Sequence, residues 1–396
     1  SIRLVGSEMC IRDRLYARSV CLRNWFPFDV AQRITHPWLC RSLGRFTHTF
    51  GLVMMNGKER IVSALNLEPV DRTPVWFMRQ AGRHLPEYRN LASKHSFWER
   101  CMNLDLCTTI TMQPIHRYKS IDAAIIFSDI LTPLPALGYE VEYGGGIRID
   151  PFSFEDVDDW TKFSARAHAP WAADGLRAIG EENSEIARLG FVGCPWTTSM
   201  YLMAGGTGDK EFHSTRAKVY SNQEDAMRVL LNVADAVGDL LADQVNHGGA
   251  DAVQMFDTWA GLLSESDYRR YAKPATERAI EVFRSKAKRR VPLIHYAKGS
   301  SHLHHEIRTL DIDAVSLDWR DDLKANRAEF GSQFAFQGNL DPSRMHGSPQ
   351  AAQEAAEHVL QNAGNEPGHI FNLGHGFSPG AQIDCVEAVL RTVTGE

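Results

Sequence analysis

The sequence lacks several features that would assign it to a familiar class. Its seven cysteines include no C-x-x-C pair, and the odd count predicts free, mostly buried thiols in a reducing compartment. No run approaches the roughly 18 apolar residues that a membrane-spanning helix needs. The net charge of −6 would repel polyanions, so nucleic acid is not expected as a partner. These absences predict a cytoplasmic protein that binds neither nucleic acid nor membranes.

Residues 1–53 differ in charge from the rest of the chain. They hold eight arginines, no lysine and three acidic residues, which gives +5 and leaves −11 for the remainder. An Arg-rich, acid-poor leader is typical of an organelle transit peptide, which would place the protein in a plastid or another organelle. Alternatively, the segment is read-through from upstream or linker sequence, and the natural start is Met54 or Met55. In either case we expect a weakly ordered N-terminal extension over 1–53 and a folded domain over 54–396.

From Asn56 onward, short apolar runs alternate with helical patterns. Asn56 and Glu59 form a predicted capping box for a helix ending near Leu67, and further helices are predicted at about 105–118, 222–247, 275–288, 349–364 and 384–392. Strands are predicted at 75–78, 122–127, 189–193, 252–256, 292–295, 313–317, 333–337 and 369–373. Eight strands alternating with helices predict an α/β fold, a single-domain (β/α)8 TIM barrel. A doubly wound open sheet is the alternative, but no dinucleotide-binding glycine fingerprint follows its first strand. Residues 138–150, with three central glycines, predict a small hairpin excursion from the barrel.

The loop after the first predicted strand is rich in arginine. The apolar run 75–78 stops abruptly, and Arg79, Arg83 and Arg89 follow it. Gly82 permits backbone angles that are closed to other residues. A guanidinium group stays charged at working pH and binds carboxylates through paired hydrogen bonds. The loop therefore predicts an anion receptor, with a surface loop of solvated arginines as the alternative.

This loop also carries a family resemblance. The run Met78-Arg79-Gln80-Ala81-Gly82-Arg83, with Leu85-Pro86-Glu87-Tyr88-Arg89 after it, resembles the signature of uroporphyrinogen decarboxylases, enzymes of the haem and chlorophyll pathways. Further stretches match that family in the same order: Phe127-Ser128-Asp129-Ile130-Leu131, Pro195-Trp196-Thr197 with Tyr201, Phe256-Asp257-Thr258, Gln337-Gly338-Asn339 and Gly374-His375-Gly376. The resemblance implies a homodimer that converts the four acetate arms of uroporphyrinogen III to methyl groups, giving coproporphyrinogen III and CO₂.

The resemblance also implies a set of site residues at the ends of the predicted strands, where barrel active sites lie. Asp129 would face the pyrrole N–H groups and the positive charge that develops on the ring. Arg79 is the second catalytic residue by analogy, although its pKa makes it a poor proton donor. The expected substrate-binding residues are Arg79, Gln80, Ala81, Gly82, Arg83, Asp129, Tyr201, Thr258 and His375. Taken alone, Asp129 could equally be a helix N-cap and Tyr201 a core tyrosine.

No cofactor or metal is expected, because a protonated pyrrole can accept the electron pair that departing CO₂ leaves behind. Zinc-dependent methyltransferases of the same fold are the nearest alternative, and they place His-x-Cys after a middle strand and another Cys near the last one. Here those positions read His295-Tyr296-Ala297 and Gly374-His375-Gly376-Phe377, without the cysteines. A metal site within 302–306 is disfavoured, since successive helical side chains point in different directions. A non-catalytic tetrapyrrole-binding barrel would lack Asp129 or Arg79, and both are present.

Overall fold

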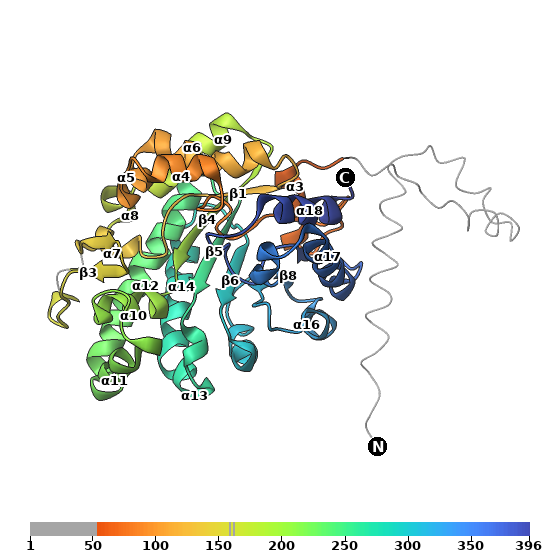
Figure 1. Cartoon of the computed structure of the whole chain (residues 1–396). Coiled ribbons are helices and arrows are strands. Elements are labelled where there is room, and N and C mark those ends of the chain that lie inside the picture. Colours follow the sequence, from red (N-terminus) through yellow and green to blue (C-terminus); the bar gives the residue numbers. More distant parts are fainter. Residues whose placement is uncertain (1–53, 158–159, 161–162) are drawn as a thin grey trace, which may run out of the picture. The chain divides into compact units, whose positions relative to one another are not determined.

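Among the residues that the structure describes, the main sheet is parallel and has seven strands. The computed structural model describes residues 54–157, 160 and 163–396, so the predicted leader lies outside the described residues. The strand order is β1-β4-β5-β6-β7-β8-β9 (Figure 1). The strands are β1 (Ala123–Ile125), β4 (Ala187–Gly193), β5 (Ala252–Asp257), β6 (Leu293–Ala297), β7 (Ala314–Ser316), β8 (Ala335–Gln337) and β9 (His369–Ile370).

Helices surround this sheet in Figure 1. They are α3 (Gly57–Leu65), α4 (Pro86–Ala92), α5 (Phe97–Met102), α6 (Leu104–Arg117), α7 (Pro133–Ala136), α8 (Ala165–His168), α9 (Trp171–Glu182), α10 (Pro195–Ala204), α11 (His213–Ser221), α12 (Gln223–Asn246), α13 (Glu265–Asp267), α14 (Lys273–Lys286), α15 (His304–Ile307), α16 (Leu323–Phe330), α17 (Pro349–Ala363) and α18 (Ile383–Thr394). Short 3-10 turns are η4 (Lys210–Phe212), η5 (Ala260–Leu262), η7 (Ser301–Leu303) and η8 (Pro342–His346), and η6 (Tyr268–Ala272) is a π-helix. Within the described residues, no helix combines the length and the apolar character needed to cross a membrane.

The six helices predicted from the sequence are confirmed as α3, α6, α12, α14, α17 and α18. The capping box that opens α3 is present: Asn56 Oδ1 accepts from the Glu59 backbone N–H at 2.9 Å, and Glu59 Oε2 accepts from the Asn56 N–H at 3.0 Å. Ser348 caps α17 in a similar way, because its side chain accepts from the Ala351 N–H. These local signals fix where helices begin because they satisfy N–H groups that have no partner inside the helix.

Residues 75–78 were predicted to form the first strand of the sheet, and this prediction is wrong because they form no regular strand. This segment makes only an isolated parallel bridge, between Val75 and Phe371. It lies beside both ends of the sheet, since the Phe371 N–H donates to Pro74 and the Asp122 N–H donates to Val75, each at 2.8 Å. Side chains accept hydrogen bonds from other N–H groups of the segment. The Asp122 side chain accepts from the Val75 N–H, that of Gln80 from the Phe77 N–H, and that of Asn372 from the Met78 N–H. Few of the segment's N–H groups are therefore left for a regular ladder.

Side chains on the inner face of the curled sheet meet across its interior. Trp76 Nε1 donates to Gln337 Oε1 at 2.9 Å, and Gln337 Nε2 donates to Gln254 Oε1 at 3.0 Å and to Ser316 Oγ at 2.9 Å. All four side chains are buried, although they come from 75–78, β8, β5 and β7. Gln254 thus marks the inner face of β5, and strand alternation places the even-numbered residues of β5 on that face.

A buried ion pair ties α3 to the segment before 75–78. The Arg60 guanidinium donates to Asp71 Oδ1 at 2.6 Å and to Asp71 Oδ2 at 2.8 Å, and it also contacts Asp122. The side chains of Arg60 and Asp71 are 5% and 6% exposed. Hydrogen bonds from Arg60 lower the pKa of Asp71 to about 2, against the opposing effect of burial.

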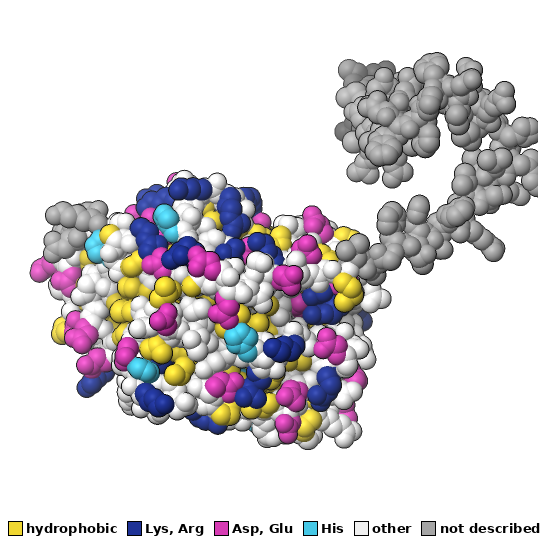
Figure 2. Space-filling view, turned by 90° about the horizontal axis from the view of Figure 1, so that it is seen from above, with side chains coloured by type: hydrophobic (Ala, Val, Ile, Leu, Met, Phe, Trp, Pro, Cys, Tyr) yellow, Lys and Arg dark blue, Asp and Glu magenta, His cyan; other side chains and the backbone are white. Residues whose placement is uncertain are grey.

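The excursion between β1 and β4 contains a second, two-stranded sheet. β2 (Val141–Tyr143) and β3 (Ile147–Ile149) pair antiparallel, with Val141 opposite Ile149. On the molecular face seen from above in Figure 2, Lys and Arg side chains are interspersed with Asp and Glu. That face therefore carries no extended field of one sign.

Candidate active site

The loop after 75–78 holds Arg79 in an unusual backbone conformation. Arg79 has φ +61°, in the left-handed region that non-glycine residues rarely adopt. The buried side chain of Gln80 fixes the turn, because it accepts from the Phe77 N–H at 3.0 Å and donates to the Ala123 carbonyl at 2.8 Å. A Cβ on Gly82 would lie 2.8 Å from the Arg79 carbonyl oxygen, so the turn requires glycine there. Gln80 and Gly82 thus shape the loop, and Arg79 remains exposed.

Asp129 lies just beyond β1, as the strand-end rule predicts. Its Oδ1 accepts from the Leu131 N–H at 2.8 Å. The N-cap of α7 is Thr132, so the alternative that Asp129 caps this helix is not observed. Burial raises the pKa of the Asp129 carboxyl above its ordinary value, while the Leu131 N–H, the Tyr143 hydroxyl and the charge of Arg79 act in the opposite direction. Asp129 is therefore a poorly hydrated carboxyl group whose charged form is supported by its neighbours.

Tyr201, on α10, belongs to the same neighbourhood. Burial and the negative charge of Asp129 raise the pKa of the Tyr201 hydroxyl, whereas Trp259 and Arg79 lower it. The ring of Tyr201 packs edge-on against Trp259, with centroids 6.2 Å apart. The structure thus brings Asp129, Arg79 and Tyr201 together from three separate parts of the chain.

His375, beyond β9, also lies beside Arg79. An added Cβ on Gly376 would lie 2.5 Å from Arg79 Cδ, which shows how closely the arginine side chain crosses this backbone. Burial, together with the nearby positive charges of Arg79 and Lys298, lowers the pKa of His375 to about 3. His375 is therefore a neutral imidazole at neutral pH when no anion is bound.

The proton on that imidazole can be assigned from its hydrogen bonds. The Tyr296 hydroxyl lies 2.9 Å from the Gly374 carbonyl oxygen and 2.9 Å from His375 Nδ1. A carbonyl only accepts, so the single hydroxyl proton of Tyr296 goes to Gly374, and His375 Nδ1 must carry a proton that it donates to the tyrosine oxygen. Nε2 of the neutral ring is then an acceptor. Donation from Nε2 to a substrate carboxylate requires the imidazolium form.

Three other predicted site residues make no hydrogen bond or ion pair with Asp129, Tyr201 or His375 in the described part of the chain. Arg83 is exposed, and its carbonyl accepts from the Arg89 guanidinium at 2.8 Å. Thr258 is half-buried directly after β5, and its hydroxyl makes no hydrogen bond within the described residues. Ala81 is half-buried in the loop beside Gly82.

Three residues near the site were missed from the sequence: Tyr143, Tyr296 and Lys298. Lys298 could have been found, because it directly follows β6 and strand ends carry active-site groups. Tyr296 is buried within a strand, where an aromatic residue gives no functional signal. Tyr143 comes from β2, in the excursion, and only the three-dimensional fold places it beside Asp129.

Cations without acidic partners characterise the site. Arg79, Arg83 and Lys298 form no ion pair within 54–157, 160 and 163–396, whereas nearby Arg320 is held by Asp318 at 2.6 Å. The residues at 302–306 have separate partners: His302 contacts the Leu263 carbonyl, and Glu306 pairs with Arg269 and Lys273, so they do not converge on one ion. Arg79 lies near the Asp129 carboxyl group and Lys298 lies near His375, so unpaired cations stand at the ends of parallel strands. Such an arrangement is typical of an enzyme that acts on an acidic small molecule.

Comparison with known proteins identifies the family. The model of the family described as "Uroporphyrinogen decarboxylase (URO-D)" matches residues 56–395. The chain is 39% identical over 357 residues to a uroporphyrinogen decarboxylase of Magnetococcus marinus, covering 86% of this chain and 98% of that one. It is 38% identical over 334 residues to the enzyme of the same name from Listeria welshimeri, covering 83% and 94%. The chain belongs to the uroporphyrinogen decarboxylase family, as its motifs indicated.

A solved structure, a methyltransferase from Methanosarcina mazei, has the same fold. It superposes with a TM-score of 0.70, covers 86% of this chain and 99% of its own, and is 16% identical in sequence. At that identity the likeness concerns the fold alone.

Proposed function

We propose that this chain removes CO₂ from the four acetate arms of uroporphyrinogen III, leaving methyl groups and giving coproporphyrinogen III. The observation that carries the proposal is the meeting of Asp129 with Arg79 and Tyr201 at the strand ends of a chain from this family. The unpaired cations Arg79, Arg83 and Lys298 suit the acetate and propionate arms. The negative net charge of the whole chain makes such local cations necessary for an acidic substrate.

The chemistry uses the pyrrole ring as its own electron sink. Protonation at a ring carbon gives a cationic iminium, the bond between the acetate methylene and its carboxylate breaks, and the electron pair of that bond flows into the ring. Protonation of the methylene carbon and loss of the first proton from the ring then give the methyl group. The net change consumes one proton and releases one CO₂ per arm.

Asp129 contributes by facing the ring N–H groups and the positive charge of the iminium. A fixed carboxylate in a poorly hydrated cleft stabilises such a charge strongly. Arg79 anchors a carboxylate and orients the arm that reacts. A guanidinium group is a poor proton donor, so a carboxyl group of the substrate or a water molecule relays the proton. Gln80, Ala81 and Gly82 hold the loop on which Arg79 lies.

The finer architecture is part of the same proposal. Segment 75–78 lies between β1 and β9 and closes the sheet into a (β/α)8 barrel, although it makes only one bridge. Residues 54–396 form the catalytic domain, which works without a metal or cofactor in the reaction. Two copies associate as a cytoplasmic homodimer, which light scattering of the purified protein would test.

Anaerobic incubation of uroporphyrinogen III with the full chain tests the function. Mass spectrometry of the products should show four successive losses of CO₂, ending at coproporphyrinogen. A substrate that binds, as seen by quenching of tryptophan fluorescence, but keeps all its carboxyl groups would instead support a non-catalytic tetrapyrrole-binding protein.

A further inference from the structure

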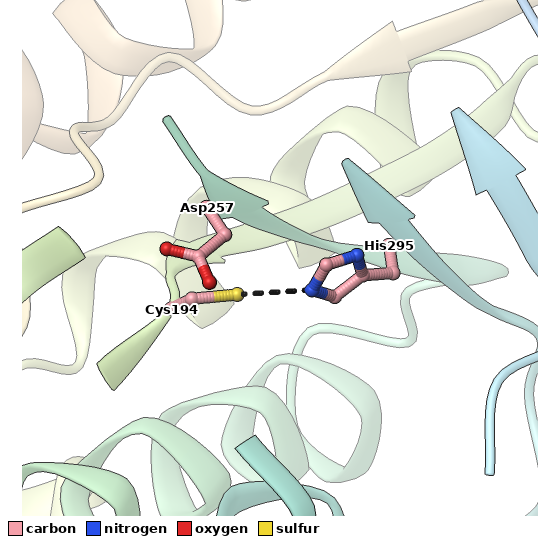
Figure 3. A group of neighbouring side chains, drawn as sticks. All are labelled: Cys194, Asp257 and His295. Atoms are coloured by element: carbon pink, nitrogen blue, oxygen red, sulfur yellow. Dashed lines mark hydrogen bonds between the residues drawn. The ribbon is translucent and has the colours of Figure 1, made fainter. Parts of the chain in front are cut away.

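Three buried polar side chains meet at a place that the proposed reaction does not use. Cys194 lies between β4 and α10, Asp257 ends β5, and His295 is within β6. Each of the three residues is 0% exposed. One candidate ligand atom from each lies within 4.8 Å of the other two, and Cys194 Sγ is 3.7 Å from His295 Nε2. Figure 3 shows the carboxyl group and the imidazole ring both directed toward the sulfur.

This cluster is on the opposite face of the sheet from the candidate active site. Phe256 pairs with Tyr296 in the strand register, and their rings contact each other on the inner face, with centroids 5.7 Å apart. Tyr296 is the residue that holds His375 at the active site. Successive side chains of a strand point to opposite faces, so Asp257 and His295 point outward, toward the layer of helices.

The three side chains leave some of one another's hydrogen-bonding atoms without a partner. Asp257 Oδ1 accepts from the Thr197 hydroxyl at 2.7 Å, but Asp257 Oδ2 and His295 Nδ1 have no hydrogen-bond partner in the part of the chain that the structure describes. The hydroxyl of Tyr268, on η6, is also buried without a partner there. Burial raises the pKa of this hydroxyl, and the charges of the neighbouring Asp257 and Cys194 raise it further. A buried polar group without a hydrogen-bond partner destabilises the fold, so the arrangement favours a further ligand.

We propose that Cys194, Asp257 and His295 bind one Zn²⁺ ion per chain. Thiolate, imidazole and carboxylate are the ligands that zinc takes in proteins, whereas Mg²⁺ and Ca²⁺ prefer oxygen alone. A divalent cation balances the thiolate and the carboxylate, so the buried cluster becomes neutral when loaded. Tyr268 is the candidate for the fourth position, either directly or through a bound water.

The sequence alone could not indicate this site. The His-x-Cys pattern of zinc ligands on one strand is absent here, because Ala297 occupies the cysteine position. The thiol comes instead from Cys194, which the parallel pairing of β4, β5 and β6 brings beside His295. An ion here would join three neighbouring strands, so its role is structural, and the reaction at Asp129 does not pass through it.

Metal binding by the purified full chain tests the proposal. After treatment with a chelator under reducing conditions, the protein is titrated with Zn²⁺ against a chromophoric chelator, and separately with Co²⁺. We expect one Zn²⁺ per chain, a rise in the thermal midpoint on loading, and a thiolate-to-cobalt charge-transfer band with Co²⁺. Cys194→Ala should weaken Zn²⁺ binding by about 100-fold or more and abolish the band.

Two further variants make the result decisive. Cys107→Ala removes another buried thiol that has no such cluster around it, and its binding should equal that of the wild type. Asp257→Asn keeps the size of the side chain and an oxygen for Thr197, so it serves if Cys194→Ala does not fold, and it too should weaken binding. The proposal is overturned if the wild type binds no stoichiometric Zn²⁺, if Cys107→Ala weakens binding as much as Cys194→Ala, or if neither cluster variant does.

Discussion

Replacement of Asp129 by asparagine separates the charge of this residue from its structural role. In the folded protein Asp129 Oδ1 accepts one backbone hydrogen bond, from Leu131 at 2.8 Å, and an asparagine oxygen can accept the same bond. The variant should therefore fold with a stability within about 1 kcal/mol of the wild type. What it loses is the negative charge that we propose to face the cationic ring.

The size of that loss follows from the surroundings of the carboxyl group. Two unit charges about 4 Å apart interact by about 4 kcal/mol when the effective dielectric constant is about 20. Each 1.4 kcal/mol of lost transition-state stabilisation costs about tenfold in rate, so Asp129→Asn should lower kcat by about 10²–10³-fold. KM should change much less, because the arms are anchored by cations rather than by Asp129.

The assay is single-turnover decarboxylation of uroporphyrinogen III, with the folded fraction checked by circular dichroism. Asp105→Asn is the matched control, since Asp105 is an exposed carboxylate in the first turn of α6, and it should leave kcat unchanged. Because burial raises the pKa of Asp129, wild-type activity should also fall on acidification at a higher pH than for a carboxyl of ordinary pKa 3.8. A well-folded Asp129→Asn protein with near-normal kcat would refute the assigned role.

Three further perturbations follow from the contacts described. Arg79→Lys keeps the charge but loses the paired hydrogen bonds to a carboxylate, so KM for uroporphyrinogen should rise about tenfold in steady-state assays; an unchanged KM would contradict anchoring by Arg79. Tyr296→Phe frees the Nδ1 proton of His375, and NMR of the ring nitrogens should show a changed tautomer; retention of the wild-type tautomer would contradict the assigned network. Asp71→Asn should destabilise the protein in denaturant titrations by about 2 kcal/mol at neutral pH, because the folded-state pKa near 2 lies below the ordinary 3.8. That difference should vanish as the pH falls through 3.8 toward 2, and a constant difference would exclude the ion pair with Arg60 as its source.

Most of the secondary structure could be predicted because its signals are local. A capping box, a first-turn proline and alternating apolar runs lie within a few residues of the elements that they define. The segment 75–78 was the exception. Its apolar residues are typical of a strand, but the side chains of Asp122, Gln80 and Asn372 accept hydrogen bonds from its backbone. Two of those partners are remote in sequence, so no local pattern could reveal them.

The candidate site was predictable only in part for a related reason. Asp129, Arg79, Tyr201 and His375 were found through family motifs and strand ends, and the structure places them near one another. Nothing in the sequence could indicate that Tyr296 sets the tautomer of His375, because that depends on one hydroxyl lying between a carbonyl and a ring nitrogen. Sequence motifs therefore identified His375, but the packing of Tyr296 against it determines which ring nitrogen of His375 carries the proton.

Neighbouring residues in β6 illustrate how one strand can serve two separate sites. His295 points to the helix side, beside Cys194, while Tyr296 points inward to His375. A shift of this strand by one residue would exchange the two faces and destroy both arrangements at once. The parallel register with β5, in which Met255 pairs with His295 and Phe256 with Tyr296, is therefore a shared requirement of the proposed zinc cluster and of the candidate active site. A metal ion that fixes this register from the outer face would support the inner face without touching the substrate.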